Sequence, residues 1–352
     1  MVHQAPLATD FQERLQIIDD VETGVRGVIA IDSTVLGPAA GGCRLWHYES
    51  HADLAADAIR LARGMSYKNA VAGLPFGGGK AVLQRPAGDF DREAVFRVFG
   101  GAVAALDGQY VTAEDVGTTM ADMQIVSERT KYVAGLKAKP GMAGGDPSPW
   151  TALGVFEAMK AAAEVRFQSE LAGLTVAVQG VGSVGRGLCR LLRDAGARLI
   201  VADVDHRLAI GVADELGAAI VEPNEIHAVA ADIFAPCALG GVLNEKSIPQ
   251  LKARLVCGAA NNQLVEERDG ELLADSGILY APDYVVNAGG IINVSAEYLA
   301  ETADQVRDRV LAIAPRLVGI FRDAEMQGVP TNIAADVLAR RIIADGRLRV
   351  AA

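Results

Sequence analysis

Apolar and polar positions follow a strand rhythm and then a helix rhythm in the first third of the chain. Residues 28–31 form a short apolar run typical of a strand. From residue 52, apolar side chains recur at helical spacing, and Ser50 is a suitable cap. This stripe consists of Leu54, Ala58, Leu61 and Met65, and it predicts a helix over residues 52–68. A second helix is predicted over residues 122–132.

Strand and helix patterns alternate in the second half. Helices are predicted at residues 151–165 and 184–195, and short apolar strands at 175–178, 199–202, 233–234, 255–257 and 278–280. Short buried strands separated by helices predict a parallel, doubly wound sheet of the Rossmann type. Residues 303–352 are predicted to be mostly helical, with Pro315 and Pro330 as interruptions.

A loop over residues 139–149 separates the two patterns. Its three prolines and three glycines cannot continue a helix or a central strand. A chain of 352 residues also suits two domains. We therefore predict an α/β fold of two domains, with residues 1–138 in an N-terminal α/β domain and residues 139–327 in a dinucleotide-binding domain.

Composition and charge narrow the class of protein. The formal net charge is -11 and the pI is near 5, which argues against a general nucleic-acid or anionic-membrane binder. The four cysteines form no CxxC pair, so neither a zinc site nor a redox motif is indicated, and no metal is expected. Residues 1–20 lack the apolar core of a signal peptide, and no apolar run is long enough to span a bilayer. We expect a cytoplasmic protein with reduced thiols.

A glycine-rich turn follows the strand predicted at residues 175–178. It consists of Gly180, Val181, Gly182, Ser183, Val184 and Gly185, between a strand and a helix, as the dinucleotide fingerprint requires. Such glycines allow close approach of a pyrophosphate, and the helix N-terminus offers free N–H groups. Asp203 ends the next strand and suits the ribose hydroxyls of NAD, although nearby Arg207 keeps NADP open. A glycine-rich turn in an α/β domain that binds no nucleotide is the alternative.

Loops after the later strands carry further candidate cofactor ligands. The carboxyl ends of parallel strands line the ligand crevice, so residues in these loops are expected to contact cofactor or substrate. The candidates for cofactor contacts are Ala235, Cys237, Ala238, Ala260, Asn261 and Asn287, and Asn262 is assigned to the substrate. Any single asparagine is equally explained as a turn-forming residue.

Two lysines stand in unusual settings. Lys68 extends the apolar stripe of the first helix, and Lys80 follows three glycines at residues 77–79. We predict that Lys68 holds a substrate carboxylate and that Lys80 acts as a neutral base, because burial and a neighbouring cation disfavour a charged amine. The glycines would let the backbone approach a ligand. The alternative is a solvated lysine whose stem lies on apolar surface.

An acid and a glycine pair complete the candidate chemistry. Asp115 comes four residues after the apolar pair Tyr110–Val111 and two residues before Gly117, so it is expected at the end of an element. Its neighbour Glu114 allows the alternative that both acids merely face water. Gly41 and Gly42 offer backbone N–H groups to an anion.

Together these segments resemble the glutamate/leucine/phenylalanine/valine dehydrogenase family. The resemblance covers nearly the whole chain and is strongest to leucine-specific members. It rests on residues 37–42, 65–69, 76–80, 112–119, 147–149, 180–185, 260–264 and 280–294. It implies reversible oxidative deamination of an L-amino acid to a 2-oxo acid and ammonia.

The resemblance also implies residue roles. Lys68 with the Gly41–Gly42 backbone would bind the α-carboxylate, Lys80 would activate water, and Asp115 would exchange protons with the amino group. Thr151 would position nicotinamide, alongside the asparagines named above. Residues 1–138 become the substrate domain, helices over 328–352 return to it, and closure of the cleft between domains would exclude water. A homo-oligomer is expected.

Substrate preference follows from the segment before Gly41. Glutamate-specific members carry a lysine there, whereas this chain has Ala39 and Ala40, so a second carboxylate would be buried unpaired. The resemblance favours branched-chain substrates. Phenylalanine is the alternative, because leucine enzymes of this family tend to carry a larger residue where this chain has Ala40, and the smaller residue enlarges the pocket. The predicted pocket residues are Ala40, Met65, Ala113, Ile291 and Val294. A catalytically silent NAD-binding regulator is the alternative of a different class, but it would not need Lys68, Lys80 and Asp115 together.

Overall fold

The computed structural model describes residues 14–350 and divides the chain into two compact units. The first unit comprises residues up to 70, 75–136 and 345–352, and the second comprises 71–74 and 137–344. Residues 1–13 and 351–352 lie outside the described part. They belong to two segments considered in the sequence analysis, residues 1–20, which lack the core of a signal peptide, and the predicted C-terminal helices over 328–352. Residues 328–344 group with the second unit, whereas we predicted that they return to the first; the domain limits stay a proposal.

The first unit is built around a mixed sheet. Its order is β1-β2-β5-β3-β6, and β4 also pairs with β5. The antiparallel pairs are β1–β2 and β2–β5, while β5 runs parallel to β3 and β4. The strands are β1 (Arg14–Asp19), β2 (Arg26–Ser33), β3 (Ala39–Ala40), β4 (Cys43–Trp46), β5 (Gly77–Gln84) and β6 (Tyr110–Val111).

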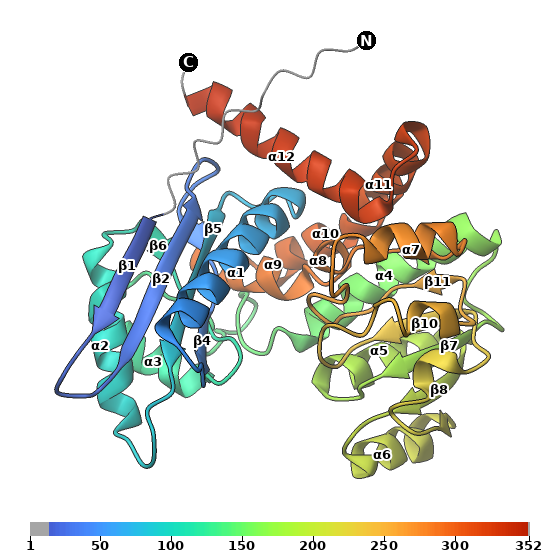
Figure 1. Cartoon of the computed structure of the whole chain (residues 1–352), viewed down its shortest axis with the longest axis horizontal. Coiled ribbons are helices and arrows are strands. Elements are labelled where there is room, and N and C mark those ends of the chain that lie inside the picture. Colours follow the sequence, from blue (N-terminus) through green and yellow to red (C-terminus); the bar gives the residue numbers. More distant parts are fainter. Residues whose placement is uncertain (1–13, 351–352) are drawn as a thin grey trace. The chain divides into compact units, whose positions relative to one another are not determined.

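Helices cover both faces of this sheet (Figure 1). On one face, α1 (His51–Val71) packs through Leu54, Ala58 and Ala62 against Val28, Ala30 and Val82. On the other face, α2 (Arg92–Ala105) and α3 (Met120–Ser127) pack against Ile29, Ile31 and Leu83. Because side chains alternate along a strand, Lys80 shares the α1 face with Val82.

Two predictions in the first unit have different outcomes. The helix predicted at residues 52–68 is confirmed as α1, and the Ser50 hydroxyl accepts the Asp53 N–H at 3.1 Å. The helix predicted at residues 122–132 is wrong at its C-terminal end, because α3 ends at Ser127. The following residues pair with Thr112 instead: Thr112 donates to the Tyr132 carbonyl, and Ala134 donates to the Thr112 carbonyl.

The second unit contains a fully parallel sheet of order β12-β11-β10-β7-β8-β9. Read from β9, this is the 3-2-1-4-5-6 order of the Rossmann fold, with its switch point between β7 and β10. The predicted fold class is confirmed. The strands are β7 (Thr175–Gln179), β8 (Arg198–Ala202), β9 (Ala219–Ile220), β10 (Ile233–Pro236), β11 (Leu255–Val256) and β12 (Leu279–Tyr280).

Helices and two 3-10 turns connect these strands and continue to the C-terminal end. The helical prediction for residues 303–352 is confirmed within the described residues. Pro315 lies in the first turn of α11, where its missing N–H costs nothing, and Gly328 ends α11 in the left-handed conformation, just before Pro330. The helices are α4 (Ser148–Phe167), α5 (Ser183–Asp194), α6 (His206–Leu216), α7 (Asp269–Asp275), α8 (Asp283–Val286), α9 (Gly289–Tyr298), α10 (Ala303–Leu311), α11 (Ile313–Gln327) and α12 (Thr331–Val350), with η1 (Ile226–Ala228) and η2 (Ile248–Gln250).

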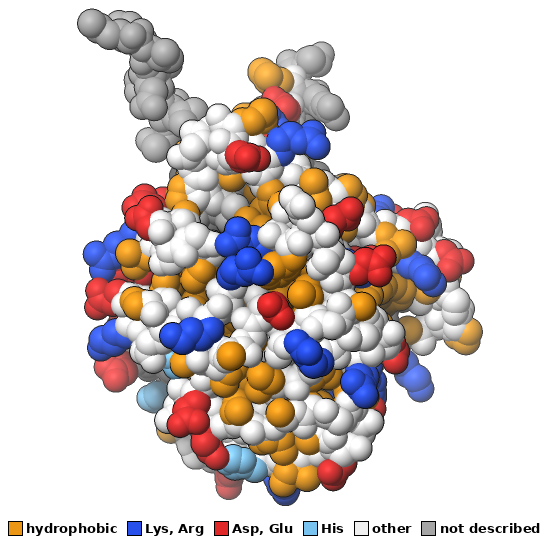
Figure 2. All heavy atoms as spheres, turned by 90° about the vertical axis from the view of Figure 1, so that its right-hand side faces the viewer, with side chains coloured by type: hydrophobic (Ala, Val, Ile, Leu, Met, Phe, Trp, Pro, Cys, Tyr) orange, Lys and Arg blue, Asp and Glu red, His pale blue; other side chains and the backbone are white. Residues whose placement is uncertain are grey.

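On the face drawn in Figure 2, acidic and basic side chains are interspersed with apolar ones and form no continuous basic stripe. Between residues 14 and 350, every helix is too short or too polar to cross a bilayer. The same residues bring together no group of three or more His, Cys, Asp or Glu side chains that would hold a metal ion.

Candidate active site

Lys80 is a buried cation in the middle of β5. Its backbone lies opposite Ala30 of β2, and its side chain is only 7% exposed. The Nζ atom donates a hydrogen bond to Asp115 Oδ2 at 2.5 Å. A buried charge is tolerated only when it is paired, so Asp115 is what makes the buried position of Lys80 possible.

Asp115 is held from three sides in the loop after β6. Its backbone N–H donates to the Thr118 hydroxyl at 2.8 Å, and that hydroxyl lies 2.9 Å from the Cys43 carbonyl of β4. The Arg44 Nε atom lies 3.4 Å from Asp115 Oδ2. Burial opposes ionisation of Asp115, but Lys80 and Arg44 outweigh it and hold the pKa of this carboxyl below its ordinary value. The acid is therefore an anion at neutral pH.

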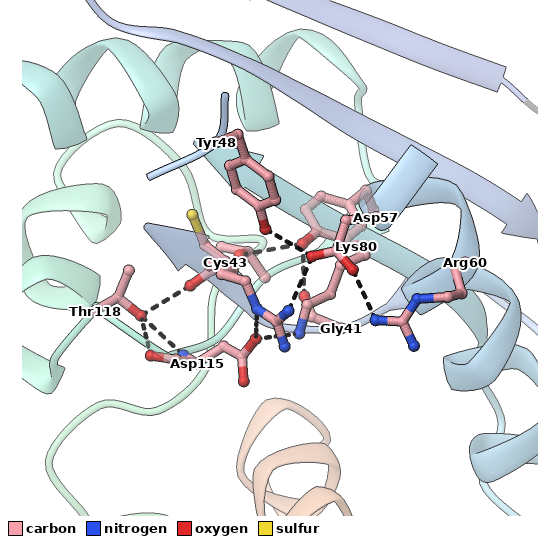
Figure 3. A network of polar contacts seen from close by, with 11 residues as sticks. Gly41, Cys43, Tyr48, Asp57, Arg60, Lys80, Asp115 and Thr118 are labelled. Atoms are coloured by element: carbon pink, nitrogen blue, oxygen red, sulfur yellow. Dashed lines mark hydrogen bonds and ion pairs between the residues drawn. The ribbon is translucent and has the colours of Figure 1, made fainter. Parts of the chain in front are cut away.

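A second carboxylate, Asp57 of α1, anchors Arg44. Figure 3 shows Asp57 between Tyr48 and Arg60. Arg44 donates to Asp57 Oδ2 at 2.9 Å, the Tyr48 hydroxyl donates to the same oxygen at 2.6 Å, and Arg60 donates to Oδ1 at 2.7 Å. We call Lys80, Asp115, Arg44 and Asp57 the Lys80 cluster. Our sequence prediction missed Arg44 and Asp57, since they come from β4 and α1 and share no sequence motif with Asp115.

The glycines around this cluster are required by packing. A Cβ atom on Gly41 would lie 1.9 Å from the Gly79 carbonyl oxygen, and one on Gly42 would lie 2.5 Å from the Glu114 carbonyl oxygen. At Gly77, Gly78 and Gly79 the neighbours are the Ser33 carbonyl, the Ser66 amide and the Tyr110 ring. Protein atoms therefore fill the space beside residues 77–79 where side chains would lie, and the approach of their backbone to a ligand stays a prediction.

Lys68 and its neighbours lie in the last turns of α1. Lys68 is half-buried, and the adjacent Asn69 is completely buried. The Asn69 amide donates to the Gly77 carbonyl at 2.6 Å and to the Ala40 carbonyl at 3.3 Å. Asn69 thus ties α1 to β5 and β3, a positioning role that a lone asparagine on a predicted helix does not reveal.

The paired glycines differ in their amides. Gly41 N–H donates to the Val111 carbonyl at 3.2 Å, and the Gly41 carbonyl accepts from the Tyr110 hydroxyl at 2.5 Å. Among residues 14–350, the Gly42 N–H has no hydrogen-bond partner. Of the predicted pair, Gly42 is therefore the donor with capacity for an anion.

The predicted pocket residues divide between the two units. In the first unit, Ala40 and Ala113 are buried, and Met65 is partly buried beside Gly41. Ile291 and Val294 are partly buried on α9 of the second unit. That these five residues line a substrate pocket stays a prediction.

In the second unit, the three glycines of the loop after β7 have different surroundings. A Cβ atom on Gly180, whose φ is +90°, would lie 2.8 Å from the Ala238 amide, and one on Gly185 would lie 2.0 Å from the Gly180 carbonyl oxygen. Gly182 has nothing within 4 Å and an ordinary φ of -64°. It precedes Ser183 and Val184 at the start of α5, where no side chain caps the helix. Packing does not require Gly182, so the loop fits an anion that approaches the helix N-terminus.

Asp203 follows β8 and organises the same loop. Its two carboxylate oxygens accept the Val181 N–H at 2.8 Å and the Asp205 N–H at 2.9 Å. Each oxygen keeps a second lone pair for a ribose hydroxyl. Arg207 is paired with Asp205 at 2.8 Å, so a 2′-phosphate would have to compete with that carboxylate.

Two asparagines, Asn261 and Asn262, lie in the loop after β11, and a third, Asn287, follows α8. The Asn287 amide donates to Asn261 Oδ1 at 2.8 Å and to the Ala259 carbonyl at 3.0 Å, whereas its own Oδ1 is buried without a partner among the described residues. Asn262 adopts a left-handed φ of 52°. An unpartnered buried acceptor fits a ligand that donates hydrogen bonds, as an amide or ribose does.

The remaining predicted cofactor residues lie near these loops. Ala235 is buried in β10, Cys237 and Ala238 follow that strand, and Ala260 is buried after β11. Thr151 lies in the first turn of α4, where its hydroxyl donates to the Pro147 carbonyl at 3.1 Å and lies near Gly290. Their ligand contacts stay predictions.

Comparison with known proteins identifies the family. Residues 11–132 match the model described as Glu/Leu/Phe/Val dehydrogenase, dimerisation domain, and residues 209–312 match the Glutamate/Leucine/Phenylalanine/Valine dehydrogenase model. A leucine dehydrogenase of Geobacillus stearothermophilus is 48% identical over 94% of this chain and 90% of the relative. The chain belongs to the glutamate/leucine/phenylalanine/valine dehydrogenase family. It is an amino-acid dehydrogenase, as predicted, which removes the silent regulator from consideration.

Two further relatives show the breadth of the family. A valine dehydrogenase of Streptomyces coelicolor is 42% identical over 96% of this chain and 93% of the relative. The crystal structure of L-tryptophan dehydrogenase from Nostoc punctiforme superposes with a TM-score of 0.83 at 43% identity, covering 95% of this chain and 96% of that one. Relatives of similar identity thus bear names of aliphatic and aromatic amino acids.

Proposed function

We propose that the protein catalyses the NAD-dependent, reversible oxidative deamination of an apolar L-amino acid, with leucine and other branched-chain substrates preferred. In balanced form, the amino acid, NAD⁺ and water give the 2-oxo acid, ammonium, NADH and a proton. The observation that carries the proposal is the buried Lys80 side chain, whose Nζ lies 2.5 Å from the Asp115 carboxylate. Such a pair supplies two groups that can accept protons, the Lys80 amine once it is neutral and the Asp115 carboxylate.

Each charged group has a distinct role in this reaction. Lys68 and the Gly42 N–H bind the α-carboxylate of the substrate. Asp115 takes a proton from the substrate ammonium, so that the amino nitrogen can form the imine. Lys80, as a neutral amine, removes a proton from the water that attacks the imine carbon. Burial around Lys80 excludes other water from this base.

The coenzyme is proposed to be NAD. When bound, it accepts a hydride from the substrate Cα. Residues 180–185 would hold the pyrophosphate at the N-terminus of α5, where Gly182 leaves open space. Asp203 would accept hydrogen bonds from the ribose and repel a 2′-phosphate, and the pairing of Arg207 with Asp205 supports the same preference. Thr151, Asn261, Asn262 and Asn287 would orient nicotinamide and substrate.

The proposed substrate side chain is apolar. Ala39 and Ala40 form β3 and are both buried, so this segment offers no cation to a second carboxylate. The names of the relatives support apolar amino acids, with leucine dehydrogenases at up to 48% identity. An aromatic substrate such as phenylalanine is the second candidate, favoured by the small Ala40 and by the tryptophan dehydrogenase relatives.

Initial rates of NADH formation test the proposal. The substrates would be L-leucine, L-valine, L-phenylalanine, L-tryptophan and L-glutamate, each with NAD and with NADP. We expect the highest kcat/KM for leucine or valine with NAD and the lowest for glutamate. Pocket size alone separates the apolar substrates by about 1–3 kcal/mol per methylene, so overlapping activities are expected. A preference for phenylalanine or tryptophan would replace the branched-chain assignment, and a preference for NADP would remove the role of Asp203.

We also propose a cytoplasmic homo-oligomer. The model matched by residues 11–132 is described as a dimerisation domain. In the first unit, β1 is an edge strand paired only with β2 among the described strands, and its Ile17 is 72% exposed. An exposed apolar edge favours association with another copy. Light scattering of the purified protein would report the number of subunits.

A further inference from the structure

The proposed reaction gives no role to Arg44, although Arg44 belongs to the Lys80 cluster. It contacts the same Asp115 oxygen as Lys80, at 3.4 Å from Nε, while its Nη1 atom donates to Asp57 at 2.9 Å. The Nε atom is buried and makes no hydrogen bond with any described residue, so its contact with Asp115 is an ion pair only. Arg44 thus holds a buried donor in reserve beside the acid.

The two cations next to Asp115 differ in their chemistry. A lysine that serves as a base must give up its charge, and Asp115 then loses that counter-ion. An arginine keeps its charge throughout the accessible pH range. A carboxylate left in a half-buried site without a cation takes up a proton more readily and no longer accepts one from a substrate.

We propose that Arg44 is a positioning residue that keeps Asp115 ionised and in place when Lys80 is neutral. Asp57 holds the guanidinium in the required orientation from α1, and the Tyr48 hydroxyl donates to the same Asp57 oxygen. Asp115 then exchanges its contact with Lys80 for the Nε–H of Arg44 without changing its charge. This role rests on the proposed functions of Lys80 and Asp115.

The other charged and titratable groups around Asp115 are the same in the wild type and in the variants described below. Burial raises the pKa values of the Cys43 thiol on β4 and the Tyr110 hydroxyl on β6, so both are neutral at the pH of the assay. Glu114, the chain neighbour of Asp115, and Lys68 on α1 are the further charged groups of these segments. None of the variants below changes them.

The test is the pH dependence of kcat/KM for L-leucine in Arg44→Gln. In the proposed mechanism the active form has a neutral Lys80 and an ionised Asp115, so the acid limb belongs to this pair. Without the guanidinium, that form loses its remaining cation, and the acid limb moves to higher pH. On that limb, at a pH where the wild type is fully active, we expect kcat/KM to fall about 10- to 100-fold and to recover as the pH is raised. A merely structural defect would lower activity equally at every pH.

Three further variants sharpen the test. Arg44→Lys keeps the charge and should keep the acid limb near that of the wild type. Arg60→Gln removes the same charge from a 57% exposed side chain that contacts Asp57 but not Asp115, and its profile should match the wild type. Arg44→Met keeps the length of the side chain without its charge; it should move the acid limb as Arg44→Gln does, and it gives the same test if Arg44→Gln does not fold.

The outcomes separate the two proposals. An active wild type whose acid limb is the same in Arg44→Gln, or a shift of equal size in Arg60→Gln, would overturn the role of Arg44 alone. An acid limb that stays in place in Arg44→Met would overturn it as well. A wild type that forms no NADH from any apolar amino acid would instead overturn the proposed function.

Discussion

Two glycine-rich segments, residues 77–79 and 180–185, differ in what surrounds their missing side chains. In the first, a Cβ atom on Gly77 would lie 1.8 Å from the Ser33 carbonyl, and the other two positions are equally filled by protein. In the second, Gly180 and Gly185 are filled but Gly182 faces open space. The glycines of the first segment therefore serve packing, which brings β2, α1 and β6 close enough to bury Lys80.

The two segments differ in the groups that would interact with a charged ligand. Around Lys80 these groups are side chains, and four charged side chains from β4, α1, β5 and the loop after β6 compensate one another. In residues 180–185, the proposed coenzyme loop, the binding groups would be backbone N–H groups at the start of α5, which need only an uncrowded approach. Substitutions should therefore separate catalysis from coenzyme binding.

The largest effect is expected from Lys80→Ala. Removal of the base should lower kcat by about 10²–10⁴-fold, while the second unit keeps its affinity for NAD. Steady-state kinetics combined with NAD titration by fluorescence would measure both. Lys68→Ala removes the same charge from α1 and serves as the control, with the loss expected chiefly in KM for the amino acid. Equal turnover in Lys80→Ala and the wild type would remove Lys80 from the mechanism.

A smaller and more selective effect is expected within the proposed coenzyme loop. Gly185→Ala places a Cβ atom 2.0 Å from the Gly180 carbonyl oxygen and should cost about 1–3 kcal/mol of unfolding free energy. Gly182→Ala should cost less than about 1 kcal/mol, because nothing lies within 4 Å, yet should weaken NAD binding roughly ten- to hundredfold. Thermal unfolding and NAD titration would distinguish the two. Unchanged NAD affinity in Gly182→Ala would mean that the pyrophosphate does not approach there.

How far the sequence predicts each region follows from how local its interactions are. The strand-turn-helix from Thr175 to Asp194 depends on neighbours in the chain, so its pattern predicted it nearly to the residue. Lys80 and Asp115 were singled out because each stands in an unusual local setting. Arg44 and Asp57 were missed because their partners are 71 and 13 residues away and only the folded sheet brings them together. The end of α3 was wrong for the same reason, since Thr112 captures residues 132–134.

The central claim is that the two regions act in one oxidative deamination, and product stoichiometry tests it most directly. Purified protein would be incubated with L-leucine and NAD, and NADH, ammonia and the 2-oxo acid would be quantified in the same sample. The proposed reaction predicts equal amounts of all three. Formation of NADH without ammonia, or of none of the three products, would contradict it.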